Sequence, residues 1–222
     1  EASNLYDELT AFDNLVFSMQ LYGVARSERA RRADALLDRF RLADKRDIPF
    51  ARLSRGMKRS LTIAAALAHR PEILFLDEPT TGLDVVSARG LRGTIAGLHG
   101  EGVTVFLTTH YLEEAERLCD RIALLVNGKI VALDTADGLK AQVQETTAVE
   151  VTLEGGPNGM EIRQIASQDI ETAARAALAE AERENRRVLA IHTVRPTLED
   201  AFVQLTGLSA DVMRAEKGGK GR

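Results

Sequence analysis

Two adjacent carboxylates end an otherwise apolar segment of this sequence. The segment reads ILFLD at residues 73–77, and Asp77 and Glu78 stand directly before Pro79. One carboxylate of such a pair can hold a hard cation such as Mg²⁺, usually through water. The other can orient or deprotonate an attacking water molecule. A local alternative also fits the spacing: Asp77 caps the turn that Pro79 begins, and Glu78 is solvated.

A histidine follows a second apolar run. VTVFLTT covers residues 103–109 and precedes His110, and residues 86–99 between the two runs predict a helix. Both runs are short and continuous, which predicts strands covered on both faces and joined by a right-handed crossover in a parallel sheet. Because ligands bind beyond the carboxyl ends of parallel strands, we expect Asp77, Glu78 and His110 at one edge. A histidine there could contact a terminal phosphate.

A second motif, LSRGMKR, begins at Leu53 and opens another predicted helix. The hydroxyl of Ser54 and the free amides near Arg55 and Gly56 form an anion site, which the positive end of the helix dipole strengthens. The alternative is an ordinary serine N-cap followed by a basic surface.

The other elements follow from apolar periodicity and turn residues. Ser27 is the expected N-cap of one helix, and Asn127-Gly128 is expected to join two strands of a hairpin within residues 121–133. Helices are predicted over residues 9–22, 27–42, 54–70, 111–120, 170–184 and 197–206, and further strands over 148–154 and 186–194.

Composition narrows the class of protein. The 222 residues are 45% hydrophobic and 28% charged, which is ordinary for a globular chain with a real core. The longest apolar runs are far below the ~20 residues that cross a bilayer. A net charge of -4 provides no basic field for nucleic acid, so we expect no nucleic acid partner. The single cysteine, Cys119, excludes an internal disulfide and is compatible with a reducing compartment.

The pattern along the chain predicts two domains and a tail. Residues 1–140 form the main domain, in which residues 1–70 are helical and residues 71–140 alternate strand and helix. Residues 141–210 predict a small α+β C-terminal domain, and the basic, glycine-rich residues 211–222 predict a disordered tail.

The two motifs together are far more specific than either alone. LSRGMKRSLTIAAALAHRPEILFLDEPTTGLD, followed by VFLTTHYLEEAERLCDRIALLVNGKIVAL, resembles the nucleotide-binding domain of ATP-binding cassette (ABC) transporters over roughly residues 1–140. The resemblance implies an α/β fold: an incomplete P-loop NTPase-like parallel sheet with a helical subdomain. RPTLEDAFVQLTG resembles the end of a small C-terminal domain found in ATPases of drug-export type, similar to those of daunorubicin resistance.

The resemblance also implies a role for each motif. Leu53 to Met57 match the signature sequence, which presses Ser54 and the Gly56 amide against the γ-phosphate of an ATP held by a partner subunit. The remaining matches are Asp77 to the Mg²⁺ ligand, Glu78 to the catalytic carboxylate, Asp84 to the acid of the TGLD loop at the dimer interface, and His110 to the histidine that reads the γ-phosphate.

The sequence departs from the family pattern in two respects. Arg55 stands where a glycine is frequent and Met57 where a glutamine is frequent, which puts the phosphate geometry at Arg55 in question. No G-x-x-x-x-G-K-[ST] phosphate loop occurs in residues 1–222, and the residues matching the segment after the family's Q-loop begin at Glu1. We therefore expect the sequence to be a fragment of a longer polypeptide that is inactive by itself.

The leading hypothesis is an ATP-hydrolysing subunit that drives export of a small molecule or lipid-like substrate. ATP and Mg²⁺ would be its cofactors, and a transmembrane permease and a second nucleotide-binding subunit, as a homodimer, its partners. It would lie in the cytoplasm on the inner face of the cell membrane. One alternative is an inactive truncated cassette that acts only as an interaction or regulatory module. Another is a soluble cassette protein acting on ribosomes or DNA, although neither a second cassette nor a long coiled coil is visible.

Overall fold

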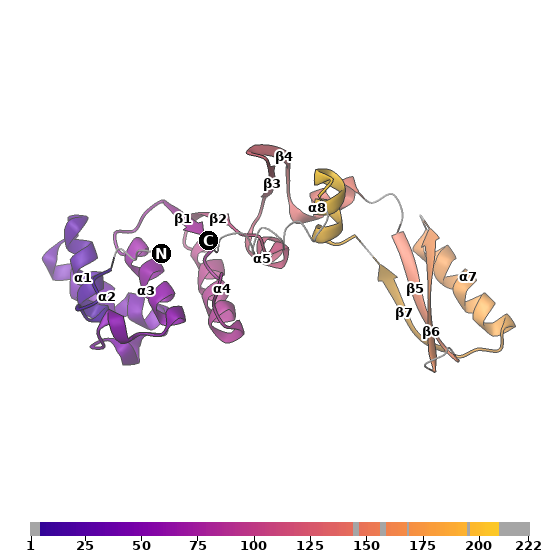
Figure 1. Ribbon diagram of the computed structural model, residues 1–222, viewed down its shortest axis with the longest axis horizontal. Coiled ribbons are helices and arrows are strands. Elements are labelled where there is room, and N and C mark those ends of the chain that lie inside the picture. The colour runs from indigo at the N-terminus through magenta and orange to yellow at the C-terminus, as the bar shows by residue number, and fades with distance from the viewer. Residues whose placement is uncertain (1–4, 144–146, 156–158, 168, 195, 209–222) are drawn as a thin grey trace, which may run out of the picture. The chain divides into compact units, whose positions relative to one another are not determined.

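The computed structural model describes residues 5–143, 147–155, 159–167, 169–194 and 196–208 (Figure 1). Internal contacts divide the chain into two compact units, Glu1–Leu118 and Cys119–Arg222. The predicted tail over residues 211–222 lies outside the described residues. The predicted domain boundary after residue 140 stays a prediction.

The first unit is mainly helical and contains one pair of parallel strands. Its core is formed by apolar side chains of the first helices together with one face of the strand pair; Leu15, Met19 and Leu61 are fully buried in it. In chain order the elements are α1 (Ala11–Leu21), α2 (Arg26–Arg39), the short 3₁₀ helices η1 (Ala43–Lys45) and η2 (Phe50–Arg52), α3 (Arg55–Leu67), β1 (Ile73–Asp77), α4 (Val85–His99), β2 (Thr104–Thr108) and α5 (Leu112–Leu118).

One predicted helix start is wrong. The N-cap of α2 is Ala25, whose side chain makes no capping bond, and Ser27 lies inside the helix. The amide of Glu28 already donates to the carbonyl of Ala25 at 2.9 Å, so the helical turn closes before Ser27. The predicted cap of α3 is correct, because the hydroxyl of Ser54 accepts a hydrogen bond from the amide of Met57.

The strand, helix and strand predicted around the two carboxylates are present. β1 and β2 pair in parallel, with Asp77 opposite Thr108, and α4 connects them. The expectation that both faces are covered is wrong for the described residues. Leu74 and Leu76 are buried on one face, whereas on the other Phe75 is 71% and Phe106 59% exposed.

The second unit combines a hairpin, a three-stranded sheet and three helices. Asn127 and Gly128 have φ of 49° and 74°, the pair of positive values that a tight type I′ turn needs, so the hairpin prediction is confirmed. The elements are β3 (Ile122–Val126), β4 (Lys129–Asp134), α6 (Ala136–Gln142), β5 (Thr147–Glu154), β6 (Met160–Ser167), α7 (Ile170–Arg183), β7 (Val188–Val194) and α8 (Leu198–Thr206).

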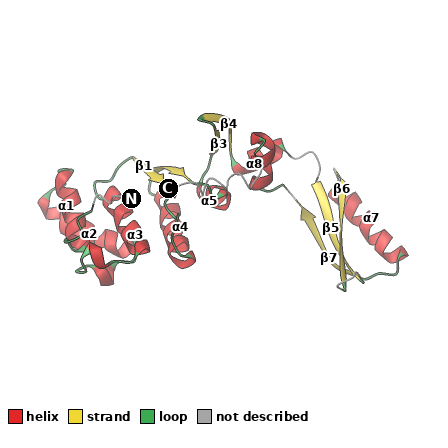
Figure 2. Cartoon of the chain, in the orientation of Figure 1, coloured by secondary structure: helices red, strands yellow, loops and turns green. Residues whose placement is uncertain are grey.

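The three-stranded sheet has a core of its own. Its order is β6-β5-β7, antiparallel throughout, and α7 runs along it (Figure 2). Val149, Val151 and Leu153 of β5 pack against alanines of α7, which let the helix lie close to the sheet. The last helix, α8, contacts α6 and both hairpin strands. No helix of the described residues has the length and apolar character needed to cross a membrane.

Candidate functional site

The candidate site begins where β1 and β2 end together. The hydroxyl of Thr108 donates to Oδ1 of Asp77, and the amide of Glu78 donates to the carbonyl of Thr108 at 3.0 Å. Asp77 is exposed at this edge. Hydrogen bonding between the two strand ends therefore fixes the first carboxylate at the edge of the sheet.

The second carboxylate has a different set of partners. Glu78 adopts a φ of 43°, a left-handed conformation that a side chain rarely takes and that ends the strand abruptly. Its Oε1 lies 2.9 Å from Nδ1 of His110, and its Oε2 accepts a hydrogen bond of 2.9 Å from the hydroxyl of Thr81. Both oxygens of Glu78 are thus held, and the carboxylate and the imidazole form one unit.

These contacts set the charge of Glu78. The hydrogen bond with His110 is the largest cause that lowers the pKa of the Glu78 carboxyl, and the bond from Thr81 lowers it further. Partial burial and the neighbouring charge of Asp77 act in the opposite direction without cancelling the effect. Glu78 is therefore ionised at neutral pH, the state in which a carboxylate can accept a proton.

An arginine from α3 supports the backbone of this turn. The guanidinium of Arg59 donates to the carbonyls of Asp77, Glu78 and Pro79 at 3.4, 2.9 and 3.1 Å. One guanidinium thus satisfies carbonyls of three successive residues at the point where the strand ends. Only the arginine's place one turn into α3 hints at this role in the sequence.

The N-termini of α3 and α4 lie against each other. Ser54 caps α3, and Asp84 caps α4 by accepting hydrogen bonds from the amide and hydroxyl of Ser87 at 2.9 and 2.6 Å. The hydroxyl bond of Ser87 is the largest cause that lowers the pKa of the Asp84 carboxyl. A Cβ placed on Gly56 would lie 2.7 Å from Oγ of Ser87, so only glycine permits this approach.

Arg55 has a definite position beside the same loop. Gly82, with a φ of 73°, would carry a Cβ only 2.5 Å from the guanidinium of Arg55. The arginine side chain therefore lies over the TGLD loop and not over the helix end where Ser54 and the free amides point. This explains how α3 accommodates an arginine where the family often has glycine.

A buried pair lies beneath the loop. Thr80 and Glu114 are 5% and 0% exposed, and the Thr80 hydroxyl donates to Oε1 of Glu114 at 2.8 Å. Neither residue was predicted from the sequence as part of the site. The one sequence feature that could have indicated this pair is the position of Glu114, four residues after His110.

The structure thus brings Asp77, Glu78 and His110 to one edge of the strand pair. A separate cluster places the Ser54 end of α3 beside the Asp84 end of α4. The roles expected for these residues remain predictions.

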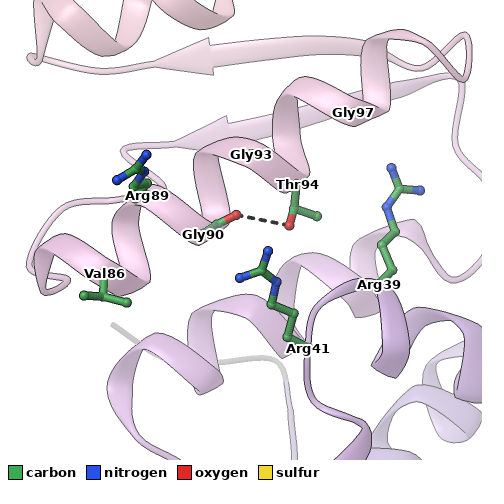
Figure 3. A pocket seen from close by; sticks show the side chains of 8 residues that line it. All are labelled: Arg39, Arg41, Val86, Arg89, Gly90, Gly93, Thr94 and Gly97. Atoms are coloured by element: carbon green, nitrogen blue, oxygen red, sulfur yellow. Dashed lines mark hydrogen bonds between the residues drawn. The ribbon is translucent and has the colours of Figure 1, made fainter.

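A cavity of about 560 Å³ lies elsewhere in the first unit. Arg39 and Arg41, at the end of α2, face α4 across it, and Arg89 and Gly90 line the opposite wall (Figure 3). None of the predicted site residues lines this cavity. The candidate site lies instead at the edge of the strand pair, where Asp77 is exposed.

The donor set at the edge suits Mg²⁺ that is bound together with phosphate. Within the described residues, no group of three or more His, Cys, Asp or Glu side chains is arranged to hold a metal ion. Mg²⁺ usually takes one or two carboxylates and fills its other positions with water and phosphate oxygens. The exposed carboxylate of Asp77 meets that requirement.

Comparison with known proteins places this geometry in a family. A profile described as "AAA domain, putative AbiEii toxin, Type IV TA system" matches residues 5–114. The solved structure "Structure of ATP binding subunit of ABC transporter" is 34% identical with a TM-score of 0.56, over 64% of this chain and 59% of that chain. The fold is therefore that of an ABC ATPase domain, as the sequence predicted.

Curated relatives define the class more closely. The fluoroquinolones export ATP-binding protein MT2762 of Mycobacterium tuberculosis (strain CDC 1551 / Oshkosh) is 39% identical over 93% of this chain and 66% of the relative. The daunorubicin resistance ATP-binding protein DrrA3 of Streptomyces coeruleorubidus is 38% identical over 91% and 69%. The chain belongs to this family of ATP-binding proteins of export-type ABC transporters. It spans just under two thirds of the length of the first relative.

Proposed function

We propose that the protein hydrolyses ATP to drive export of a small molecule or lipid-like substrate through a membrane partner. The observation that carries the proposal is the contact between Glu78 and His110 beside Asp77, at the open edge of a parallel strand pair. In this arrangement Glu78 is a carboxylate that could activate water, and Asp77 beside it is a carboxylate that could bind a cation. Membership of the export family supports the coupling to transport.

Glu78 is the proton acceptor in this proposal. Its carboxylate is ionised, and His110 and Thr81 hold its two oxygens in a fixed direction. A water molecule that replaces one of these partners would be oriented by the carboxylate and would lose its proton to it. The imidazole of His110 would then be free to donate to a phosphate oxygen, and its Nε2 has no hydrogen-bond partner among the described residues.

Asp77 has the complementary role of holding Mg²⁺. The bond from Thr108 engages one carboxylate oxygen and leaves the other available to a cation. ATP would supply the phosphoryl group, and Mg²⁺ would neutralise its negative charge. The chain's own contribution at this point is to fix one oxygen ligand at the strand end.

The cluster at Ser54 would serve an ATP molecule held by a second copy of the protein. The hydroxyl of Ser54 and the amide of Gly56 lie at the positive end of α3, where an anion is favoured. Asp84, at the start of α4, would contact the second copy across the interface. Arg55 would contribute its backbone amide, since its side chain lies over Gly82. The partner in this proposal is an identical subunit, so a homodimer encloses two ATP molecules.

The remaining assignments follow from the same proposal. The protein would lie in the cytoplasm at the inner face of the membrane, bound to a transmembrane permease subunit, and would bind no nucleic acid. Residues 1–140 would form the cassette, divided after residue 70, and residues 141–210 a small C-terminal domain that contributes packing or dimer contacts.

The test compares the protein expressed from its complete gene with residues 1–222 alone. We expect the first to bind Mg-ATP and to release phosphate, and residues 1–222 to do neither, because this sequence contains no phosphate loop. Hydrolysis by residues 1–222 would show that the phosphates are held differently. If neither protein bound ATP, the second candidate, a cassette that acts only as an interaction or regulatory module, would take its place.

A further inference from the structure

Glu114 is a fully buried carboxyl group in the first turn of α5. It is 0% exposed, and its Oε1 accepts the 2.8 Å hydrogen bond from the hydroxyl of Thr80. Among the described residues its Oε2 has no hydrogen-bond partner. One strong contact and one unsatisfied oxygen are an unusual arrangement for a buried acid.

Stability alone does not explain this arrangement. Burying a carboxyl group costs free energy unless its oxygens are fully hydrogen-bonded, and an apolar side chain of similar size would fill the same space at less cost. Such a buried acid is better explained by a neighbouring group whose position it fixes. That group is Thr80, because Glu114 accepts the hydrogen bond of its hydroxyl.

Thr80 lies in the middle of the turn that carries the catalytic candidate. Directly after it, Thr81 donates its amide to the carbonyl of Glu78 at 3.2 Å and its hydroxyl to Oε2 of Glu78 at 2.9 Å. A shift of Thr80 would therefore move the group that directs Glu78. The bond from Thr80 to Glu114 fixes this turn from the buried side.

The segment that contains Glu114 also carries the second partner of Glu78. His110 lies two residues before α5, and its Nδ1 is 2.9 Å from Oε1 of Glu78. The segment 110–114 thus holds the turn at two points: His110 contacts the carboxylate of Glu78, and Glu114 holds the hydroxyl of Thr80. Two contacts set both the position and the direction of the carboxylate, whereas one would leave the turn free to pivot.

We propose that Glu114 is a positioning residue for ATP hydrolysis. It locks the turn at Thr80 so that the Glu78 carboxylate stays directed toward His110 and the attacking water. The proposal rests on the proposed function, in which Glu78 is the proton acceptor.

The decisive variant is Thr80→Val, which keeps the shape of the side chain and removes the hydroxyl. In the protein expressed from its complete gene, we expect kcat to fall by roughly tenfold, because small misplacements of a catalytic group are costly. The KM for ATP should change by less than about twofold, since the turn is displaced without loss of a binding group. Thr94→Val is the matched control: it removes a hydroxyl that bonds only to the carbonyl of Gly90 on α4, and kcat should not change.

Two substitutions at Glu114 complete the test. Glu114→Met removes the acceptor and should lower kcat as Thr80→Val does, whereas Glu114→Gln keeps a carbonyl oxygen for Thr80 and should retain kcat within about threefold. The double variant Thr80→Val with Glu114→Met should be no slower than either single variant, since both remove the same contact.

A second readout does not depend on turnover. Hydrogen exchange measured by mass spectrometry should show faster exchange of the amides of Glu78, residue 80 and Thr81 in Thr80→Val, with unchanged protection of α3 and α4. The proposal is wrong if folded Thr80→Val has the kcat and the exchange rates of the unmodified protein. Failure of the proposed function would look different: Glu78→Gln would then leave hydrolysis unaffected, whatever Thr80→Val does.

Discussion

Nδ1 of His110 lies 2.9 Å from Oε1 of Glu78, although the two residues are 32 positions apart in the chain. They meet because β1 and β2 are parallel and end at the same edge, where Asp77 stands opposite Thr108. The contact joins the residue that follows β1 to a residue that follows β2. Any change in the register of the two strands would separate them.

Replacing Glu78 with Gln should abolish most hydrolysis. Glutamine keeps the size of the side chain but cannot accept a proton, so turnover should fall by roughly 10²- to 10⁴-fold. Phosphate release measured at saturating Mg-ATP is the assay. Glu113→Gln is the matched control, because Glu113 is an exposed glutamate on α5, and it should leave turnover unchanged. Full turnover in Glu78→Gln would exclude the proton-acceptor role.

Removing His110 should change the pH dependence of the reaction. The hydrogen bond with His110 is the main cause that holds the pKa of Glu78 below its usual range, so His110→Ala should raise that pKa. Glu78 must be ionised to act, and the acidic limb of the kcat/KM profile should therefore move to higher pH. Thr81→Val removes the smaller contribution and should move the limb by less. A limb that stays in place in both variants would mean that another group controls it.

Adding a methyl group at Gly56 should disturb the contact between α3 and α4. A Cβ there would lie 2.7 Å from Oγ and 2.9 Å from Cβ of Ser87, so α4 would have to move. We expect a loss of about 1–3 kcal/mol in the free energy of unfolding and a large loss of hydrolysis. Gly93→Ala is the matched control: a Cβ there meets nothing within 4 Å, and it should stabilise the helix by about 0.5–1 kcal/mol. Chemical denaturation and phosphate release measure both effects.

Acid should weaken the ion-pair network of the three-stranded sheet. Hydrogen bonds from Arg163 are the main cause that lowers the pKa values of Glu161 and Glu184 in the folded protein. A carboxyl whose folded pKa is depressed stabilises the fold above its unfolded value, about 4.3, and loses this contribution as the pH falls through the folded pKa. We therefore expect a shallower loss of stability below about pH 4 in Glu184→Gln than in the unmodified protein. Glu182→Gln, at an exposed position on the same helix, should not change the slope.

Much of the first unit was predictable from the sequence. Continuous apolar runs with a helix between them identified β1, α4 and β2, and the rule for parallel sheets brought Glu78 and His110 to one edge. In the second unit, the Asn127-Gly128 pair identified the hairpin, because few residues other than glycine and asparagine accept positive φ.

Other features depend on contacts that no short sequence pattern encodes. β6 was missed because Met160 and Ile162, two of its apolar residues, are exposed, while Arg163 takes part in ion pairs. Arg59 on α3 donates a hydrogen bond to the carbonyl of Glu78 in the turn after β1, and Glu114 on α5 accepts one from Thr80 in the same turn. Such long-range contacts are visible only once the chain is folded. The roles expected of the site residues stay predictions: Ser54, Arg55, Gly56, Asp77, Glu78, Asp84 and His110.

The packing of α8 has a consequence for synthesis of the protein. Its apolar residues Leu198, Ala201 and Phe202 are buried, and the helix contacts β3, β4 and α6, although three strands and a helix separate them in sequence. On the ribosome the hairpin therefore emerges long before the helix that covers it. A nascent chain stopped before Leu198 would carry an incompletely covered hairpin, exposed to chaperones and proteases, whereas the three-stranded sheet and α7 would already be complete.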